Sequence, residues 1–339
     1  MTRPTIRDLA EAAGVSVSTV NRVLSGAASV RSPTISLVQE AAERIGFYGL
    51  GTIRSQITAR QTKYRFGFLL LQPFRLYYKN LGAALEAAAR REEVLIEPVV
   101  TYAEDLSPQY TAARLLELGQ HCQAVAVVAV AHPMVLKAVE TLQQGGVPVV
   151  AMISQLAAGV NYVGADNWKA GRTAAWAIAN VCKAPGKIGI LVGNHRFRCQ
   201  EMNESGFRSY FREFAPDFTL LEPLSTFETS AVAEEMTEKL LSENPDLKGL
   251  FVAGGGISGA MRALRGAAQP RQVVTIGHQL MDNTRDGLLD GTVTMILHDP
   301  AEATARETIA VMIRACEAGP DSSPQQIALP FEIYTPENI

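Results

Sequence analysis

The chain has 339 residues, of which 47% are apolar and 19% are charged, and this composition is typical of a packed globular protein with two or three domains. No apolar run approaches the roughly 18 residues that a membrane-spanning helix requires, and no apolar segment follows Met1, so we expect neither membrane insertion nor secretion. The net charge of −3 would argue against a nucleic-acid-binding protein if it were spread evenly along the chain.

The charge is not spread evenly. Residues 1–60 contain seven arginines, no lysine and four acidic residues, so their net charge is +3 and the remainder of the chain carries −6. A basic N-terminal segment on an acidic body indicates that only the N-terminal segment meets phosphate groups.

Cysteine and histidine spacing gives no sign of a metal site or a cofactor. The four cysteines, Cys122, Cys182, Cys199 and Cys316, lack metal-ligand spacing and the density of a disulfide scaffold, so we expect free thiols in a reducing cytoplasm. The five histidines form no helical pair, and no Ser-His-Asp, HExxH or Walker motif occurs.

Three short helices are predicted within residues 1–48. The segment from Thr5 to Asp8 has the pattern of a capping box, Ser16 caps a second helix, and Ser32-Pro33 starts a third. Gly14 supplies a tight turn between the first two helices, which is the arrangement of a helix-turn-helix motif.

The second helix of such a motif presents its early residues to the major groove of DNA. Asn21 suits adenine, Arg22 suits guanine, and Val17 can touch a thymine methyl group. Helix spacing alone leaves open a small three-helix unit without a DNA partner.

The stretch from Thr5 to Gly26 resembles the N-terminal headpiece of the LacI/GalR family of transcriptional regulators, and the similarity continues without gaps to Phe47. The resemblance implies that Val17, Ser18 and Arg22 read bases in the major groove. It also implies four side chains near phosphates or the groove edge: Thr5, Ser16, Thr19 and Asn21.

Residues 49–62 correspond to the hinge helix of this family, which forms on DNA and pushes an apolar side chain into the minor groove. The resemblance implies that Ile57 is the wedge and that Ile53 lies on the same DNA-binding helix. The sequence departs from the family at Gly49-Leu50-Gly51, which replaces the usual proline–asparagine and adds chain entropy. The alternative for both isoleucines is packing against a dimer mate.

Residues 63–339 alternate short apolar runs with helical segments, which predicts parallel sheets covered on both faces. The expected strands are Phe66–Leu71, Val94–Val100, Ala124–Val130, Val147–Ile153, Ile188–Val192, Gly249–Ala253, Val273–Gly277 and Val293–Leu297. The expected helices include Leu81–Arg91, Tyr110–Leu118, Lys169–Val181, Glu204–Phe214 and Ala231–Ser242. A break near Asn161–Asp166 indicates two lobes, lobe 1 at about 63–163 plus 298–320 and lobe 2 at about 164–297 plus 321–339.

This body resembles the two-lobed periplasmic sugar-binding protein fold that the LacI/GalR family carries as its sensor. Gly164–Gly171 matches the family's strand-to-helix turn, and Gly206-Phe207 matches the end of its ligand-loop motif. The expected fold is therefore an all-α three-helix headpiece with a hinge helix, followed by an α/β two-lobed core with parallel sheets.

Ligands of such sheets bind beyond the carboxyl ends of the strands, so we expect an effector cleft between the lobes. The resemblance and the strand ends together give the candidate residues Tyr77, Tyr78, His132, Ser154, Gln155, Arg198, Glu201, Asn203, Phe227, His278, Gln279 and His298. The two tyrosines would stack on a sugar face or merely cover the sheet, and Arg198 would bind hydroxyls or be a surface cation.

The candidate cleft lacks a carboxylate that is common in sugar binders. His278-Gln279 stands where an aspartate is frequent, and a cleft with three histidines and Arg198 would be rich in donors. An acidic or phosphorylated sugar would suit such a cleft, although neutral histidine also accepts hydrogen bonds, so the class of ligand stays open.

Two other functions compete with a regulator. Gly254–Gly259 fits GxGxxG between a strand and a helix, which would indicate an NAD-dependent oxidoreductase, but no acid follows the next strand to hold a ribose hydroxyl. Close backbone packing or a ligand-facing turn explains the glycines better. A sugar-binding protein without a regulatory role would not need the headpiece.

The sequence therefore predicts a cytoplasmic, nucleoid-associated transcriptional regulator and not an enzyme. We expect a homodimeric repressor on double-stranded, near-palindromic operator DNA, controlled by a small sugar-like effector. No heptad pattern follows Ile327, so a coiled-coil tetramer is not indicated. Inducer and co-repressor roles of the effector both stay open.

Overall fold

The computed structural model describes residues 3–25, 30, 32–51, 53, 63–267, 273–319 and 322–339. The chain divides into two compact units, one made mainly of Met1–Tyr64 and the other of Arg65–Arg91 and Glu97–Ile339. Within the described ranges, no helix is both long and apolar enough to cross a membrane.

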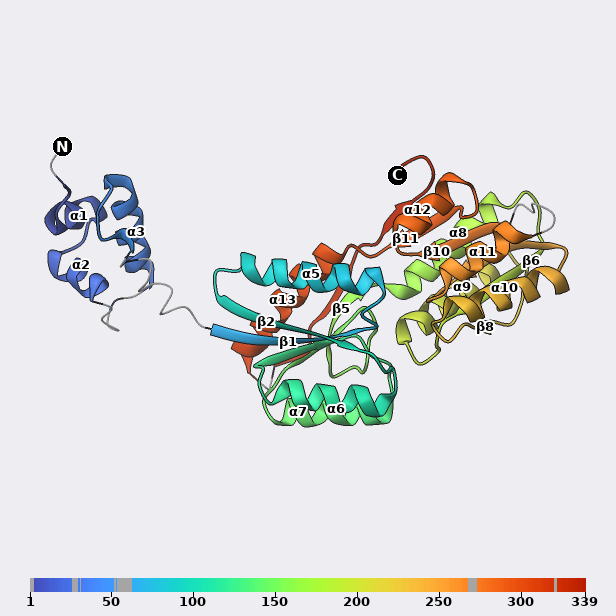
Figure 1. Ribbon diagram of the computed structural model, residues 1–339, viewed down its shortest axis with the longest axis horizontal. Helices are drawn as coiled ribbons and strands as arrows, with labels where there is room; N and C mark the ends of the chain where they lie inside the picture. Colours follow the sequence, from blue (N-terminus) through green and yellow to red (C-terminus); the bar gives the residue numbers. More distant parts are fainter. Residues whose placement is uncertain are drawn as a thin grey trace. The chain divides into compact units, whose positions relative to one another are not determined.

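The first unit, here called the headpiece, contains α1 (Ile6–Ala13), α2 (Val17–Leu24) and α3 (Ser32–Ile45), which Figure 1 shows gathered around one another. The predicted capping box is present, because Asp8 N donates to Thr5 Oγ1 at 3.3 Å and Thr5 N donates to Asp8 Oδ2 at 2.7 Å. Gly14 ends α1 at φ 65°, a left-handed conformation that favours glycine, and the chain turns there into α2.

The headpiece core changes the interpretation of the segment after α3. Ile53 is fully buried with Leu9, Val20, Val38 and Phe47. This differs from the expectation, which placed the Ile53 side chain on DNA or against a second subunit. Its amide donates to the Gly49 carbonyl at 3.2 Å, within a helical turn that starts at residue 50.

Gly49 has a packing role in this turn. A Cβ there would lie 2.7 Å from the Phe47 ring, so the missing side chain lets the backbone pass against the aromatic. Ile57, the expected wedge, lies outside the described residues.

Ile53→Ala should destabilise the headpiece by about 2–5 kcal/mol, because it leaves a cavity in a small core. Hydrogen exchange of the α1–α3 amides in the full-length protein measures the change, and Ile53→Val should cost only about 0.5–1.5 kcal/mol. If these amides keep their protection and DNA binding is lost, Ile53 contacts DNA and is not a core residue.

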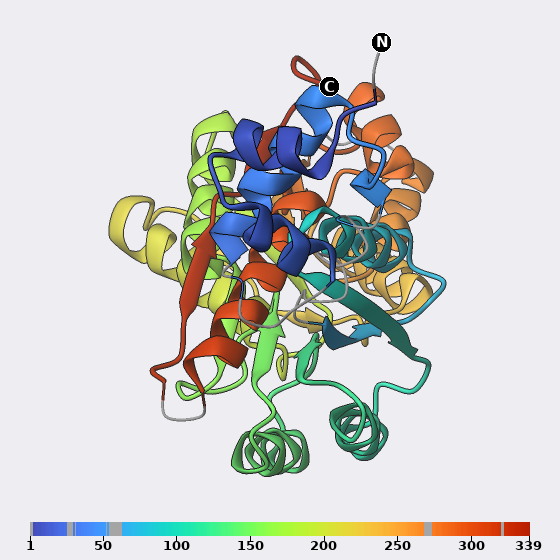
Figure 2. The same ribbon diagram turned by 90° about the vertical axis from the view of Figure 1, so that its left-hand side faces the viewer.

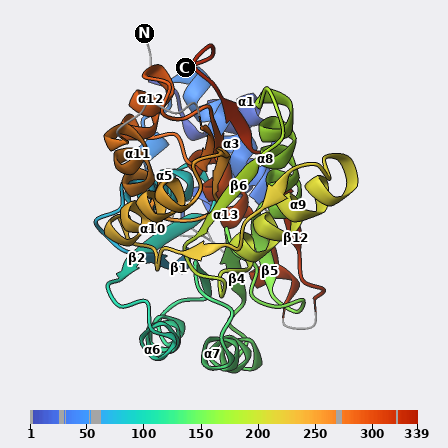
Figure 3. The same ribbon diagram turned by 90° about the vertical axis from the view of Figure 1, so that its right-hand side faces the viewer.

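Lobe 1 of the second unit is a six-stranded sheet in the order β12-β5-β4-β3-β1-β2. Its strands are β1 (Lys63–Leu71), β2 (Leu95–Ala103), β3 (Ala124–Val127), β4 (Val149–Met152), β5 (Asn161–Ala165) and β12 (Gln326–Leu329). Neighbours from β12 to β1 run parallel. Helices α5 (Leu76–Arg91) and α13 (Ala301–Ala318) pack together on one face of the sheet. Helices α6 (Pro108–Gly119) and α7 (Pro133–Gln144) lie side by side on the other face, seen end-on in Figures 2 and 3.

Lobe 2 is a seven-stranded sheet in the order β13-β11-β10-β9-β6-β7, with β8 also paired to β6. Its strands are β6 (Lys187–Val192), β7 (Thr219–Leu220), β8 (Leu224–Ser225), β9 (Leu247–Val252), β10 (Val274–His278), β11 (Met295–His298) and β13 (Glu332–Tyr334). Only β13 is antiparallel to its partner among the described pairs. One face carries α8 (Asn167–Val181) and α9 (Arg198–Phe214), and the other carries α10 (Ser230–Glu243), α11 (Ile257–Gly266) and α12 (Asp282–Leu289).

The lobe boundaries differ from the expectation at the C-terminal end. Strand β12 pairs with β5, so residues 326–329 belong to lobe 1, and only β13 belongs to lobe 2. The chain therefore passes between the lobes three times, after β5, after β11 and between β12 and β13. All eight expected strands are present, although β3 ends at Val127 and not at Val130.

Candidate functional site

The start of α2 presents the polar side chains that were expected on DNA. Ser16 caps the helix by accepting from Thr19 N at 3.1 Å, and its hydroxyl lies 2.8 Å from the Thr19 hydroxyl. Val17 is 41% exposed, and Ser18 and Asn21 are also exposed. The apolar face of α2 is buried through Val20 and Val23, so the opposite face is free to meet a duplex.

Arg22 lies along this exposed face. Its Nη2 donates to Ser18 Oγ at 3.1 Å, and its Nε lies 3.4 Å from the Ser18 carbonyl oxygen. These contacts hold the guanidinium beside Ser18, which is also expected to read bases.

A broad hollow borders the start of α2, and five of its seven lining residues were not predicted from the sequence to meet DNA. It is lined by Arg3, Pro4, Thr5, Ile6, Arg7, Val17 and Tyr48. Tyr48 is 71% exposed, with its ring centroid 4.6 Å from that of Phe47. Arg3, Arg7 and the exposed Tyr48 extend the candidate DNA surface beside α2. The positive charge of the arginines, and the position of all three residues next to the helix-turn-helix motif, could have predicted this from the sequence.

In the second unit, Tyr77 and Tyr78 open α5 with their ring centroids 5.3 Å apart, edge to face. Burial raises the pKa of both hydroxyls, and the charge of Asp299 adds to the effect on Tyr77. Both tyrosines therefore stay neutral donors at the junction of the lobes.

Asp299 supplies the carboxylate that was expected to be missing. It directly follows β11, and its Oδ2 accepts from Gln279 Nε2 at 3.1 Å. Burial raises its pKa to about 6, partly offset by the Gln279 hydrogen bond. The rule that polar residues follow strand ends would have found this side chain.

Four buried polar atoms around the lobe junction have no hydrogen-bond partner among the described residues. They are the Tyr77 hydroxyl, Arg198 Nε, Asn203 Oδ1 and Gln279 Oε1. Two of these atoms are donors or can donate, and two are acceptors. Buried polar groups are normally paired, so this set points to a bound molecule that carries several hydroxyl groups.

A pocket of about 240 Å³ opens at the junction, near Arg198. Its lining residues are Gln155, Tyr162, Ala165, Asp166, Asn167, Trp168, Arg198, Cys199, Met202, Gln326 and Ala328. They combine one aromatic wall with amide, carboxylate and guanidinium groups, and the volume is slightly below the roughly 300 Å³ at the low end for drug-sized ligands. Such a pocket fits a molecule of monosaccharide size.

Two of the expected histidines have local structural roles. His132 Nδ1 accepts from Met134 N at 3.2 Å and caps α7. His298 Nδ1 accepts from Leu280 N at 3.2 Å, and its ring packs edge-on against Tyr334. The junction is therefore less rich in donors than the sequence suggests.

The remaining expected residues divide into those that meet at the junction and those that do not. Ser154 is fully buried and accepts from Cys199 N at 3.4 Å, and Asn203 lies 3.4 Å from His278 Nε2. Glu201 lies on the exposed side of α9, and Phe227 is 71% exposed, so neither belongs to the buried cluster.

Two glycines set how close α8 and α9 come. A Cβ on Gly171 would collide with the Asn203 backbone, and a Cβ on Gly206 would collide with the Trp168 carbonyl. This close approach places Asn203 and Trp168 at the junction.

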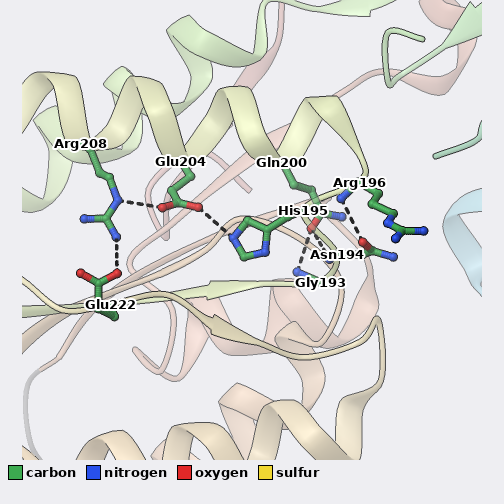
Figure 4. Close-up of polar contacts among 8 residues, drawn as sticks. All are labelled: Gly193, Asn194, His195, Arg196, Gln200, Glu204, Arg208 and Glu222. Atoms are coloured by element: carbon green, nitrogen blue, oxygen red, sulfur yellow. Dashed lines mark hydrogen bonds and ion pairs between the residues drawn. The ribbon is translucent and has the colours of Figure 1, made fainter. Parts of the chain in front are cut away.

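The loop before α9 is tied to the helix that carries Arg198. Figure 4 shows Gln200 pointing back to the loop, where its Oε1 accepts from Gly193 N at 2.7 Å and Asn194 N at 3.0 Å. Farther along α9, Glu204 lies 3.1 Å from His195 Nε2 and accepts from Arg208 Nε at 2.7 Å. These contacts fix the direction in which α9 begins.

The pH dependence of stability should report the burial of His278. Burial lowers its pKa to about 4, so the unfolded state binds more protons between about pH 6.5 and 4, and the free energy of unfolding falls as pH is lowered through this window. Urea unfolding at pH 7 and pH 5 should show a smaller loss for His278→Gln than for wild type. Asp299 acts in the opposite direction between about pH 4 and 6, so only the difference between the two proteins is diagnostic. Equal losses would show that His278 is not buried as a neutral group.

Comparison with known proteins identifies both units. A model described as "Periplasmic binding protein domain" matches residues 77–320, and one described as "Bacterial regulatory proteins, lacI family" matches residues 5–49. The chain belongs to the LacI family of bacterial regulatory proteins. This LacI-family chain is a DNA-binding transcriptional regulator whose headpiece is followed by a two-lobed periplasmic-binding-protein domain.

Curated relatives of this LacI-family regulator align over most of their length. It is 25% identical to the HTH-type transcriptional regulator GntR of Pseudomonas aeruginosa, over 99% of this chain and 96% of the relative. It is also 25% identical to the sucrose operon repressor of Streptococcus mutans, over 83% of this chain and 82% of the relative.

Solved structures of solute-binding proteins share the fold of the two-lobed unit. The glucose-galactose binding protein GanP of Geobacillus stearothermophilus matches with a TM-score of 0.75 and 15% identity, over 82% of this chain and 99% of its own. A solute-binding protein of Actinobacillus succinogenes with bound D-allose matches with a TM-score of 0.73 and 19% identity, over 81% and 98%.

Proposed function

We propose that this regulator is a cytoplasmic, nucleoid-associated homodimeric repressor, with two headpieces on a near-palindromic operator about one helical turn apart. Val17, Ser18 and Arg22 read bases, and the exposed face of α2 supports this assignment. Thr5, Ser16, Thr19 and Asn21 contact phosphates or the groove edge. Ile57 remains the proposed minor-groove wedge.

The effector is a small, neutral, polyhydroxylated molecule of sugar type. The observation that carries this proposal is the set of four unpaired buried atoms, because hydroxyl groups both donate and accept. Arg75 is paired with Glu228, and the junction carries the carboxylate of Asp299 as well as the guanidinium of Arg198. These acidic and basic groups are equal in number, so they leave no surplus positive charge for a sugar acid. The names of the sucrose operon repressor and of the D-allose complex are consistent with this class.

The effector controls DNA binding through the angle between the lobes. It shifts operator affinity only by its different affinity for the two lobe arrangements, typically 1–3 kcal/mol of coupling. The chain has no catalytic role in this scheme, since its relatives are transcriptional regulators.

The glycine-rich turn does not favour an oxidoreductase. A Cβ on Gly254 would collide with Gln200, and one on Gly259 would collide with the Ser230 carbonyl, so protein packing already needs these glycines. The space in front of the turn is taken by side chains of the chain itself.

Isothermal titration calorimetry of the full-length protein tests the class of effector. The panel contains neutral hexoses, pentoses, polyols, aldonic acids and sugar phosphates. We expect one neutral compound to bind with saturation, and Asn203→Leu, which removes an unpaired acceptor, to weaken it. Binding of sugar acids or phosphates alone would overturn the neutral assignment, and no binding by any of them would overturn the sugar-type assignment.

A further inference from the structure

An ion pair joins the loop that follows β1 in lobe 1 to the loop that follows β8 in lobe 2. Arg75 follows β1 in lobe 1, and Glu228 lies in the loop between β8 and α10 in lobe 2. Arg75 Nη1 lies 3.0 Å from Glu228 Oε2, and Arg75 Nη2 donates to the Glu228 main-chain carbonyl. A single guanidinium therefore holds both the side chain and the backbone of the opposite lobe.

This pair is well shielded from water. The side chains of Arg75 and Glu228 are only 24% and 9% exposed. The second carboxylate oxygen, Glu228 Oε1, accepts from Gln200 Nε2 at 2.6 Å, so both oxygens are engaged. Removal of one partner would leave a buried charge unpaired, which is strongly unfavourable.

Three glycines leave the space that the Glu228 carboxylate and its partner Gln200 occupy. A Cβ on Gly193 or Gly255 would collide with that carboxylate, and a Cβ on Gly254 would collide with Gln200 Oε1. The carboxylate can therefore lie directly against two backbone segments of lobe 2. The GxGxxG turn, which the DNA-binding function leaves unexplained, acquires a role here.

The backbone of the same loop is held in a costly conformation. Phe227 and Glu228 have φ values of 50° and 61°, although neither is glycine. Thr226 Oγ1 donates to the Gly255 carbonyl at 2.7 Å and holds the loop within lobe 2. Arg75 of lobe 1 binds the same loop by donating to the Glu228 carbonyl. Such backbone strain persists only where several surrounding contacts hold the loop in place.

We propose that Arg75, Glu228 and Gln200 form an interlobe latch that keeps the sensor domain closed before any effector binds. Opening of the lobes requires the Arg75–Glu228 pair to break. The latch goes beyond the proposed function, because it concerns the resting state of the protein and not the identity of the effector.

Two amides report directly on closure. Ala131 N in lobe 1 donates to the Arg196 carbonyl in lobe 2 at 2.9 Å, and Cys199 N in lobe 2 donates to Ser154 Oγ in lobe 1 at 3.4 Å. Both hydrogen bonds break when the lobes separate, so exchange at these amides follows opening.

Hydrogen exchange of the full-length protein, without effector or DNA, tests the latch. Glu228→Gln and Arg75→Met should each speed exchange at Ala131 and Cys199 by about tenfold or more. The double variant should not exceed the larger single effect, because the two residues act as one pair.

A matched control is Glu213→Gln, which breaks the Arg172–Glu213 pair within lobe 2 and should leave both reporter amides unchanged. A variant that also exchanges faster at the amides of β9 has unfolded. In that case Arg75→Lys replaces it, because lysine keeps the positive charge but lacks the planar guanidinium, and we expect an intermediate increase in exchange. Wild-type exchange at Ala131 and Cys199 in folded variants would overturn the latch.

Discussion

Replacement of Arg22 by alanine is expected to lower the affinity for operator DNA by about 1–3 kcal/mol per half-site, roughly 5- to 150-fold for each. The guanidinium lies on the exposed face of α2 beside Ser18, and Arg22 is not part of the headpiece core among the described residues, so the loss should come from the DNA contact and not from unfolding. Fluorescence anisotropy at fixed salt measures the affinity, and binding of the effector should be unchanged.

Arg22→Lys is the matched control for this prediction. It keeps the positive charge but cannot form the two parallel hydrogen bonds that read guanine, so it should lose preference for operator over random DNA while keeping the salt dependence. If Arg22→Lys instead behaves as wild type on both DNAs, Arg22 contacts phosphate and not a base.

Replacement of Arg198 by alanine should weaken effector binding by about 1.5–3 kcal/mol, roughly 10- to 150-fold, because hydrogen bonds from charged groups are worth that much. Arg198 begins α9, lines the junction pocket, and has its Nε buried without a partner. Calorimetric titration with the compound that binds wild type measures the loss, and operator affinity without effector should not change.

Arg212→Ala is the control on the same helix, because Arg212 is exposed near the far end of α9 and should not affect the effector. Equal affinities of Arg198→Ala and Arg212→Ala would remove Arg198 from the site and leave it as a surface cation.

Most of the fold could be predicted because its signals are local. Buried parallel strands are continuous apolar runs, and all eight expected strands occur. Strand β5, Asn-Tyr-Val-Gly-Ala, breaks such a run, and β12 is half exposed at a sheet edge, so neither gives a clear pattern. The error in the lobe boundary follows from β12, because strand pairing across the chain leaves no mark in a single segment.

The candidate site was harder to predict than the fold, since its chemistry depends on contacts between distant segments. The sequence shows that His132 and His298 follow strands, but not that each accepts a backbone N–H. It shows Glu228 in a loop, but not Arg75 against it, more than 150 residues away in the chain. The same limit applies to Ile53, because an apolar side chain at this position fits a DNA-binding hinge helix and a headpiece core equally well.

In this regulator, we propose, one chain joins sequence-specific DNA binding to effector sensing. The most direct test is fluorescence anisotropy of the full-length protein on DNA from upstream of its own gene, with and without the compound that binds in calorimetry, across a range of salt. We expect tight binding to this DNA that weakens steeply with salt and that the compound shifts by roughly 5- to 150-fold. Binding no tighter than to random DNA, or operator binding that is indifferent to a compound bound in the cleft, would contradict it.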